Sequence, residues 1–416
     1  MRAVRKEITF VCTDKVERQC CEPVAAEAER RGYAVRFTTN QFERCEIGFY
    51  LSHVNFPKYS KFSIITLHDL TQQRGQWPVM WKNEFWTQFD VGFLPGKDWA
   101  DMWHDASCYD FVRPRHGCYQ CGWLKADITD SREFREENER IIKEYGIDTS
   151  KKTVLYAPSW EWGGRQVETA EAVRGTDVNL IIKQFPLSPD KFPEQVELIR
   201  EADEKTKALG LSNVHILDTN INILNAISLC DVLVSEESST MSEAMLLDRP
   251  VIAVTDWLVP DVRPPRKPET GHDFTIKIER KDLRRTIAEV VSDETWRSKA
   301  RSYREAHFPG GGQSAKTVID VIDNILYGTE NTVPRIAEKS PERTPPQFGK
   351  SVRARRRTMR LILLKKKFVD RSRLLTLVWN ILRTARNGLR AKMGGGYGYI
   401  VILHPSVCRP QSREAA

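Results

Sequence analysis

The stretch VSEESSTMSEAMLLDRPVIAV (234–254) decides the fold of this chain. Two short apolar runs, DVLVSE (231–236) and PVIAVTD (250–256), flank a cluster of hydroxyl and carboxylate residues that opens a helical pattern. The stretch holds neither a P-loop lysine nor a glycine fingerprint. A strand, a helix and a second strand in this order are typical of a parallel sheet that is buried on both faces.

The same alternation of short apolar runs and helical patterns extends over most of the chain. It predicts an α/β protein with two Rossmann-like parallel-sheet domains, a GT-B-like arrangement in which two such domains face a cleft. We place the N-terminal acceptor domain at 1–130 and the nucleotide-donor domain at 131–330. The other expected strands are 8–12, 33–39, 46–52, 62–68, 90–96, 152–158, 178–184 and 213–218.

The net charge of +8 hides a strong division along the 416 residues. Residues 335–416 carry 20 Lys and Arg against four Asp and Glu, which leaves residues 1–334 with a net charge of −8. We expect a Pro- and charge-rich linker at 331–352 and a basic helical tail at 353–416. The spacing of apolar residues in the tail predicts an amphipathic helix. These residues are Leu374, Val378, Ile381, Leu382, Ala385 and Leu389.

A basic amphipathic helix favours an anionic membrane surface as its partner. A solvated tail and nucleic-acid binding are the alternatives, although the tail lacks the interleaved aromatic residues of a single-strand binder. No apolar run long enough to span a bilayer and no signal-peptide core occur. We therefore expect a cytoplasmic protein whose tail can attach it to the inner face of the plasma membrane, and no nucleic-acid partner.

The nine cysteines favour reduced thiols, because the count is odd and no secretion signal is present. Cys118 and Cys121 form a C-x-x-C pair, but no second pair or matching histidines stand at metal-ligand spacing. We predict no metal site and no cofactor.

Ser238, Ser239 and Thr240 stand where the helix after the 231–236 strand should begin. Their hydroxyls and the first-turn N–H groups would suit a diphosphate, and Glu243, one turn later, would suit the hydroxyls of a ribose. The site would lie at the carboxyl end of a parallel strand, where open α/β sheets bind ligands. The alternative is a plain capped helix between two strands.

This segment resembles the donor-binding segment of GT-B transferases, and most closely that of the CDP-glycerol glycerophosphotransferase family, D-x-L-I-T-D-Y-S-S-x-x-F-E-Y-x-x-L-x-x-P. KKTVLYAPSW (151–160), SIITLHD (63–69), HGCYQCGWLKAD (116–127) and FPGGGQSAKTVIDVI (308–322) resemble four further motifs of that family. The resemblance covers about residues 60–325. The matching residues of the donor segment are Asp231, Ser238, Ser239, Glu243, Leu247 and Pro250.

The resemblance implies a catalytic base at His68, which would accept the proton of an attacking acceptor hydroxyl. Asp69, which we include in the catalytic site, replaces a family glycine. In IIKQFPLSP (181–189), Lys183 could supply positive charge, but Phe185 stands where the family has a histidine close to the transferred phosphoryl group. A phenyl ring cannot donate to a phosphoryl oxygen, so this position speaks against simple glycerophosphate transfer. A strand-end histidine with a capping role is the alternative for His68.

Four more residues complete the predicted donor site. Arg263 and Arg266 could clamp a pyrophosphate, and Gln313 with Ser314 could approach a ligand at a helix start. A solvated loop and a flexible turn are the respective alternatives.

The resemblance implies a transferase that moves a polyol phosphate from a CDP-glycerol-like donor to a lipid-linked or saccharide acceptor in cell-envelope polymer synthesis. A UDP-sugar glycosyltransferase or epimerase of the same fold is the second hypothesis, and a non-catalytic assembly partner is the third. The fold alone does not separate the three.

Overall fold

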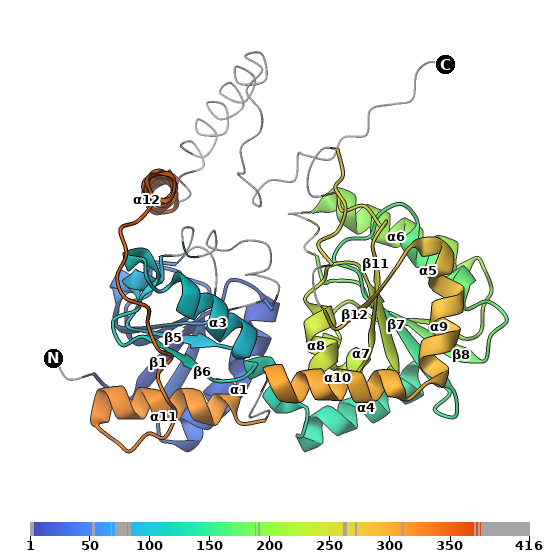
Figure 1. Ribbon diagram of the computed structural model, residues 1–416, viewed down its shortest axis with the longest axis horizontal. Helices are drawn as coiled ribbons and strands as arrows, with labels where there is room; N and C mark the ends of the chain where they lie inside the picture. Colours follow the sequence, from blue (N-terminus) through green and yellow to red (C-terminus); the bar gives the residue numbers. More distant parts are fainter. Residues whose placement is uncertain are drawn as a thin grey trace, which may run out of the picture. The chain divides into compact units, whose positions relative to one another are not determined.

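A computed structural model describes residues 4–51, 55–67, 69–70, 81, 85–187, 189, 192–260, 264–270, 273–308, 312–369, 372 and 375. Residues 1–341 form one compact unit and residues 342–416 a second. The first unit contains two six-stranded sheets in which every strand pair is parallel (Figure 1). The expected α/β architecture with two Rossmann-like domains is thereby confirmed.

The first sheet has the strand order β2-β1-β3-β4-β5-β6. Its β6 falls inside the 116–127 motif, where no strand was predicted, because three residues carry too little pattern to identify. The strands are β1 Glu7–Val11, β2 Ala34–Thr38, β3 Cys45–Tyr50, β4 Ser60–Ile65, β5 Val91–Leu94 and β6 Cys118–Gln120. The accompanying helices and 3₁₀ turns are α1 Lys15–Arg30, η1 Pro57–Tyr59, η2 Trp86–Gln88, α3 Lys97–Ala106, η3 Asp110–Val112 and η4 Leu124–Ile128.

The second sheet has the order β12-β11-β10-β7-β8-β9. Its strands are β7 Lys152–Tyr156, β8 Val178–Ile182, β9 Val214–Ile216, β10 Val232–Ser235, β11 Val251–Val254 and β12 Thr275–Ile278, of which β12 was not predicted. The helices and one 3₁₀ turn are α4 Arg132–Tyr145, α5 Arg165–Ala172, α6 Pro193–Lys207, α7 Ile223–Ser228, α8 Thr240–Leu246, η5 Arg280–Asp282, α9 Leu283–Ser292 and α10 Thr295–His307.

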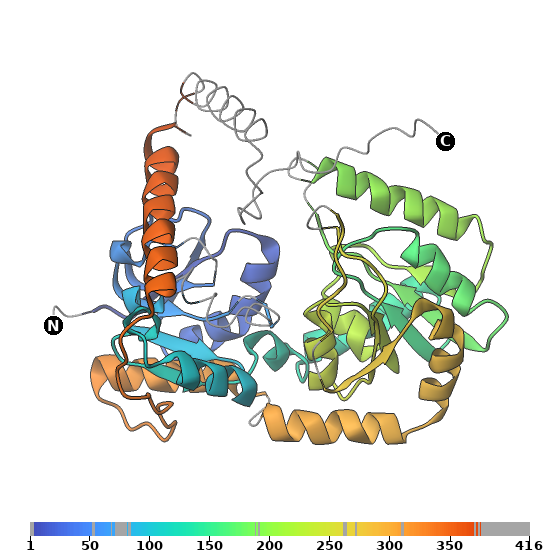
Figure 2. The same ribbon diagram turned by 45° about the horizontal axis from the view of Figure 1, so that its top comes forward.

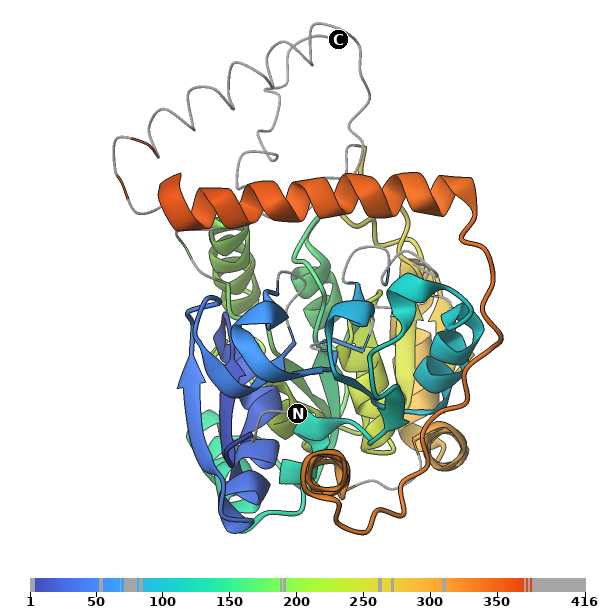
Figure 3. The ribbon, with the colours of Figure 1, turned by 90° about the vertical axis from the view of Figure 1, so that its left-hand side faces the viewer.

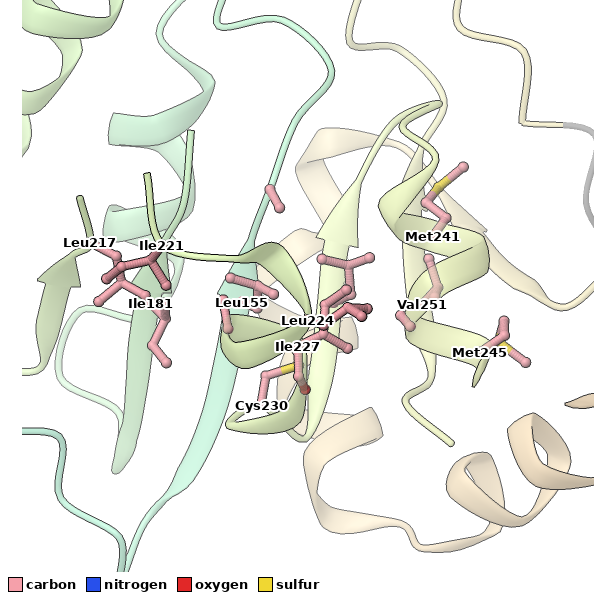
Figure 4. Packing of buried hydrophobic residues seen from close by; sticks show 14 of the residues in the cluster. Leu155, Ile181, Leu217, Ile221, Leu224, Ile227, Cys230, Met241, Met245 and Val251 are labelled. Carbon is pink, nitrogen blue, oxygen red and sulfur yellow. The ribbon is translucent and has the colours of Figure 1, made fainter. Parts of the chain in front are cut away.

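Alternate residues of the second sheet supply two separate cores, as the period of two along a strand requires. Leu155, Ile181 and Val251 pack with α4, α7 and α8 on one face (Figure 4). Val154, Ile252 and their neighbours pack with α5 and α9 on the other face. This double burial explains why the strands read as continuous apolar runs.

Helix α11 (Ser314–Tyr327) belongs to the first sheet, although its sequence falls within the segment expected as the donor domain. It packs beside α1 (Figure 3). Arg31 at the end of α1 lies 2.6 Å from Asp320 Oδ1, and the Tyr33 hydroxyl donates to Asp323 Oδ1 at 2.6 Å. The sequence pattern showed an amphipathic helix, but it could not show which sheet the helix would cover.

The segment expected as a linker is not uniform. Arg335 bridges Tyr119 of β6, and Ile336 N donates to Cys118 O at 2.9 Å, so residues 335–336 extend the open edge of the first sheet. The edge strand thus has a covering segment.

The second unit begins with α12 (Pro346–Leu364), a single unbroken helix followed by the π-helical turn η6 (Lys365–Val369) (Figure 2). Among the described residues, no helix is long and apolar enough to cross a membrane. Of the helix predicted from Leu374 to Leu389, the structure describes Leu375 alone.

Candidate functional site

The chain reverses its direction of strand addition at β7 and β10 of the second sheet, which are neighbours in space but not in sequence. Open α/β sheets bind ligands at the carboxyl ends of such strands. The loops that follow the two strands are joined by Ser235 Oγ and Thr240 Oγ1, which both donate to Ala157 O, at 2.8 and 3.4 Å. The stretch 234–240 therefore occupies the position in this sheet that best suits a ligand.

Ser238, Ser239 and Thr240 form a tight turn at this position. Ser238 Oγ accepts from Thr240 N at 3.3 Å, and the N–H groups of Met241 and Ser242 donate to carbonyls within the turn. The side chain of Ser239 makes no capping hydrogen bond and is half-buried, as are those of Ser238 and Thr240. A phosphate here would thus meet hydroxyl groups first, because first-turn N–H groups that we expected to be open are used within the turn.

A buried ion pair lies directly beneath this turn. Glu236, which is fully buried, accepts from Arg165 Nη1 and Ser159 N, both at 3.0 Å. Arg165 also donates to Trp160 O at 3.1 Å and to Leu258 O. The sequence pattern did not identify either partner, although an acidic residue directly after a buried strand is the signal that points to them. The pair fixes the loops that follow β7, β10 and β11.

A second buried group connects the loops after β7 and β8. Glu161 Oε2 accepts from the Tyr156 hydroxyl at 2.7 Å and from Gln184 Nε2 at 3.1 Å. Burial raises the pKa of Glu161 above its ordinary value, and the two hydrogen bonds counteract part of that rise. This network holds the residues before Phe185 in place.

Lys183 is buried at the end of β8, and its Nζ donates to Gln184 O and Thr219 O, both at 2.8 Å. Burial lowers the pKa of Lys183 to about 7, and the nearby charge of Lys125 acts in the same direction. The amine predicted to face a donor is thus engaged by backbone carbonyls. Phe185, two residues later, is 49% exposed.

Glu243, the predicted ribose ligand, is buried in α8. Its Oε1 accepts from Lys125 Nζ at 3.0 Å and from Trp123 Nε1 at 3.1 Å. Both partners come from the 116–127 segment, so Glu243 joins the two halves of the first unit. Access of a ribose to this oxygen would require these contacts to rearrange.

Arg266 is held by Glu237 through two parallel hydrogen bonds of 2.7 Å, and the same carboxylate accepts from Glu269 N at 2.9 Å. The predicted pyrophosphate clamp is therefore paired with an acidic group next to the serine turn. Arg263 lies outside the described residues.

Gln313 and Ser314 lie at the start of α11. The described contacts at this helix start are with the 116–127 segment and not with the serine turn. Ser314 is buried against Gly122, and Asp127 Oδ2 accepts from Ala315 N at 2.7 Å. Burial raises the pKa of Asp127, while hydrogen bonds from Ser314 and Ala315 lower it. The described contacts give these residues a capping function between α11 and the 116–127 segment.

The predicted base His68 lies outside the described residues. Its neighbour Asp69 is half-buried in the loop after β4, and Thr66 Oγ1 donates to Phe93 O at 3.2 Å at the start of that loop. The catalytic assignment to His68 and Asp69 stays a prediction.

Eight cysteines in the described part of the chain are free and buried. Burial raises the pKa of Cys118 and of Cys121 above their ordinary values, so both thiols stay protonated at neutral pH. No group of His, Cys, Asp and Glu among the described residues is arranged to hold a metal ion.

No family model and no curated protein matches the sequence. Among solved structures, the wall teichoic acid polymerase TagF is similar, with a TM-score of 0.51, 15% identity, and coverage of 77% of this chain and 89% of TagF.

Two further structures are similar. A putative UDP-N-acetylglucosamine 2-epimerase from Listeria monocytogenes has a TM-score of 0.55 and 13% identity, with coverage of 80% of this chain and 100% of its own. An S. aureus MnaA–UDP complex has a TM-score of 0.54 and 13% identity, with coverage of 81% and 100%. At these identities the likeness concerns the fold alone, and that fold is GT-B: two parallel α/β domains in one chain.

Proposed function

We propose that this protein is a GT-B enzyme of cell-envelope polymer synthesis that uses a nucleotide-diphosphate-activated donor. The observation that carries the proposal is the Ser238–Thr240 turn at the carboxyl ends of β7 and β10. The Ser238 and Ser239 hydroxyls at this point of a parallel sheet can donate to phosphate oxygens, whereas the Thr240 hydroxyl already donates to Ala157 O. The buried Arg165–Glu236 pair beneath the turn keeps those hydroxyls in place before a ligand arrives.

A CDP-glycerol-like donor is the first candidate. It is supported by the motifs around Ser239 and His68 and by the fold that the chain shares with TagF, one variant of which was soaked with CDPG. In this scheme the acceptor hydroxyl, with His68 as its base, would attack the donor phosphorus, and the serine turn would hold the leaving nucleotide. The acceptor would be a lipid-linked or saccharide hydroxyl.

A UDP-sugar is the second candidate, and a specific observation favours it. Phe185, exposed at the end of β8, offers no hydrogen-bond donor to a phosphoryl group. The fold is also shared with a UDP-GlcNAc 2-epimerase from Neisseria meningitidis bound to UDP-GlcNAc, which has a TM-score of 0.53 and 12% identity. A non-catalytic assembly partner is the third candidate.

A thermal-shift panel tests the proposal. We expect the melting temperature to rise with at least one of CDP-glycerol, CDP-ribitol, UDP-sugars and GDP-sugars, because a ligand that binds the native state stabilises it by mass action. Turnover is then measured with whichever compound stabilises. Stabilisation by UDP compounds alone would exclude the CDP-glycerol donor, and the absence of any shift would contradict the nucleotide site itself.

The second unit supports attachment to an anionic membrane surface. Along α12 and η6, one exposed stripe changes from basic to apolar: Arg353, Arg357 and Arg360 are followed by Leu361, Leu364 and Phe368. These three apolar side chains are 52%, 51% and 62% exposed. Such a helix end can place its apolar groups among lipid chains while the arginines meet anionic headgroups. This peripheral location would bring the enzyme to a lipid-linked acceptor.

A further inference from the structure

Three large apolar side chains are exposed around the carboxyl edge of the second sheet. Trp162 is 37% exposed after β7, Phe185 is 49% exposed after β8, and Leu258 is 40% exposed after β11. Among the described residues of 1–341, Tyr327 is the one other large apolar side chain of comparable exposure, and it lies over Lys6 near Tyr33. Apolar surface gathered at one edge points to a binding site.

The residues that directly precede the two aromatic side chains are joined by a buried hydrogen bond. Gln184 Nε2 donates to Glu161 Oε2 at 3.1 Å and to Gln166 Oε1 at 2.7 Å. Trp162 follows Glu161 directly, and Phe185 follows Gln184 directly. Because a buried hydrogen bond joins the preceding residues, the two rings are anchored on neighbouring, rigid loops.

The same loops are connected to the serine turn. Arg165 donates to Glu236, which precedes the turn, and to Trp160 O and Leu258 O in the two flanking loops. The exposed rings and the hydroxyls of Ser238–Thr240 therefore belong to one edge with one buried support. A ligand whose phosphates meet the hydroxyls would extend a further group toward these loops.

We propose that Phe185 and Trp162 bind the sugar ring of a nucleotide-activated donor. An exposed phenyl or indole face packs against the C–H surface of a pyranose, whereas the short, hydroxylated glycerol chain of a CDP-glycerol donor has no such ring face. Of the three cations predicted for the donor site, Lys183 is engaged by two backbone carbonyls and Arg266 by Glu237, and Arg263 lies outside the described residues. This inference rests on the proposed nucleotide site and selects the UDP-sugar class of donor within it.

Isothermal titration of the full chain with paired ligands tests this assignment. UDP is compared with UDP-glucose and UDP-N-acetylglucosamine, and CDP with CDP-glycerol, in the wild type and in Phe185→Ala, Trp162→Ala and Phe185→Leu. Tyr327→Ala, which removes a ring of α11 that is 37% exposed, is the matched control. Both alanine variants should weaken UDP-sugar binding about tenfold relative to UDP, and Phe185→Leu should retain part of the affinity.

The possible outcomes distinguish a failure of this inference from a failure of the proposed nucleotide site. Equal weakening of UDP and UDP-sugars would assign the rings to the base, and unchanged binding of both would remove them from the site; either result overturns the inference. A wild type that binds CDP-glycerol more tightly than any UDP-sugar overturns it as well. A wild type that binds none of the five ligands contradicts the nucleotide site itself, which is the earlier proposal.

Discussion

Lys125 Nζ lies 3.0 Å from Glu243 Oε1, and both side chains are almost completely buried. Lys125 belongs to η4, which packs against α1 of the first sheet, and Glu243 belongs to α8 of the second. Trp123 Nε1 donates to the same oxygen at 3.1 Å. A residue expected to face a ribose is thus part of the contact that joins the two sheets.

Removing one member of this pair should destabilise the protein strongly. Glu243→Ala or Lys125→Ala leaves a charge buried without its partner, for which a loss of about 3–5 kcal/mol in the free energy of unfolding is typical. Urea denaturation at pH 7 measures the change. The double variant Lys125→Met with Glu243→Leu should recover most of the loss, since no charge is left buried. Single variants as stable as the wild type would show that the pair is not maintained in solution.

Ser239→Ala should weaken nucleotide binding without lowering the stability of the free protein. The Ser239 side chain makes no capping bond, so its loss costs the fold little, whereas a hydrogen bond to a charged phosphate contributes about 1.5–3 kcal/mol. We expect affinity for the stabilising nucleotide to fall by about tenfold or more. Ser302→Ala, an exposed serine of α10, is the control. Equal affinity of Ser239→Ala and the control would place the phosphates elsewhere.

Lys183 should make stability rise with pH above neutrality. Its folded pKa of about 7 lies below the ordinary lysine value, so between these values the unfolded chain binds more protons than the native state. The free energy of unfolding therefore increases with pH, by up to about 1.4 kcal/mol per pH unit. Comparing the wild type with Lys183→Met at pH 7.0 and 8.5 isolates this contribution, because all other groups are shared. If the difference in the free energy of unfolding between the two proteins is the same at both pH values, the pKa of Lys183 is not lowered.

The sequence predicted the strands of this fold better than the contacts of its site. Apolar runs such as 231–236 identify a buried strand locally, because burial on both faces removes polar residues. The partners of Glu243 and Arg266 are about 120 and 29 residues away in the chain, and no local pattern encodes them. Helix α11 shows the same limit, because the sequence pattern predicts its apolar face but does not predict which sheet that face covers.

His68→Ala should abolish turnover with the stabilising donor while nucleotide binding stays unchanged. The resemblance of SIITLHD to the family motif assigns His68 the proton of the acceptor hydroxyl, and general-base catalysis typically contributes 10²–10⁴-fold. Initial rates together with titration of the donor separate the two effects. His104→Ala, in α3, is a matched histidine control. Unchanged turnover in His68→Ala would remove this residue from the mechanism.

Replacing Leu361, Leu364 and Phe368 by Ser in the full chain should release the protein from anionic vesicles. The three side chains are exposed on α12 and η6, and burial of apolar surface contributes about 25 cal/mol per Å² to membrane binding. Replacing Arg353, Arg357 and Arg360 by Gln should weaken binding to phosphatidylglycerol vesicles and reduce its dependence on salt, because headgroup attraction is screened by ions. Leu258→Ser, which removes an exposed leucine from the first unit, controls for a general loss of hydrophobic surface. Co-sedimentation with anionic and zwitterionic vesicles measures all three. If the serine and glutamine variants sediment as the wild type does, α12 is not the membrane-binding element.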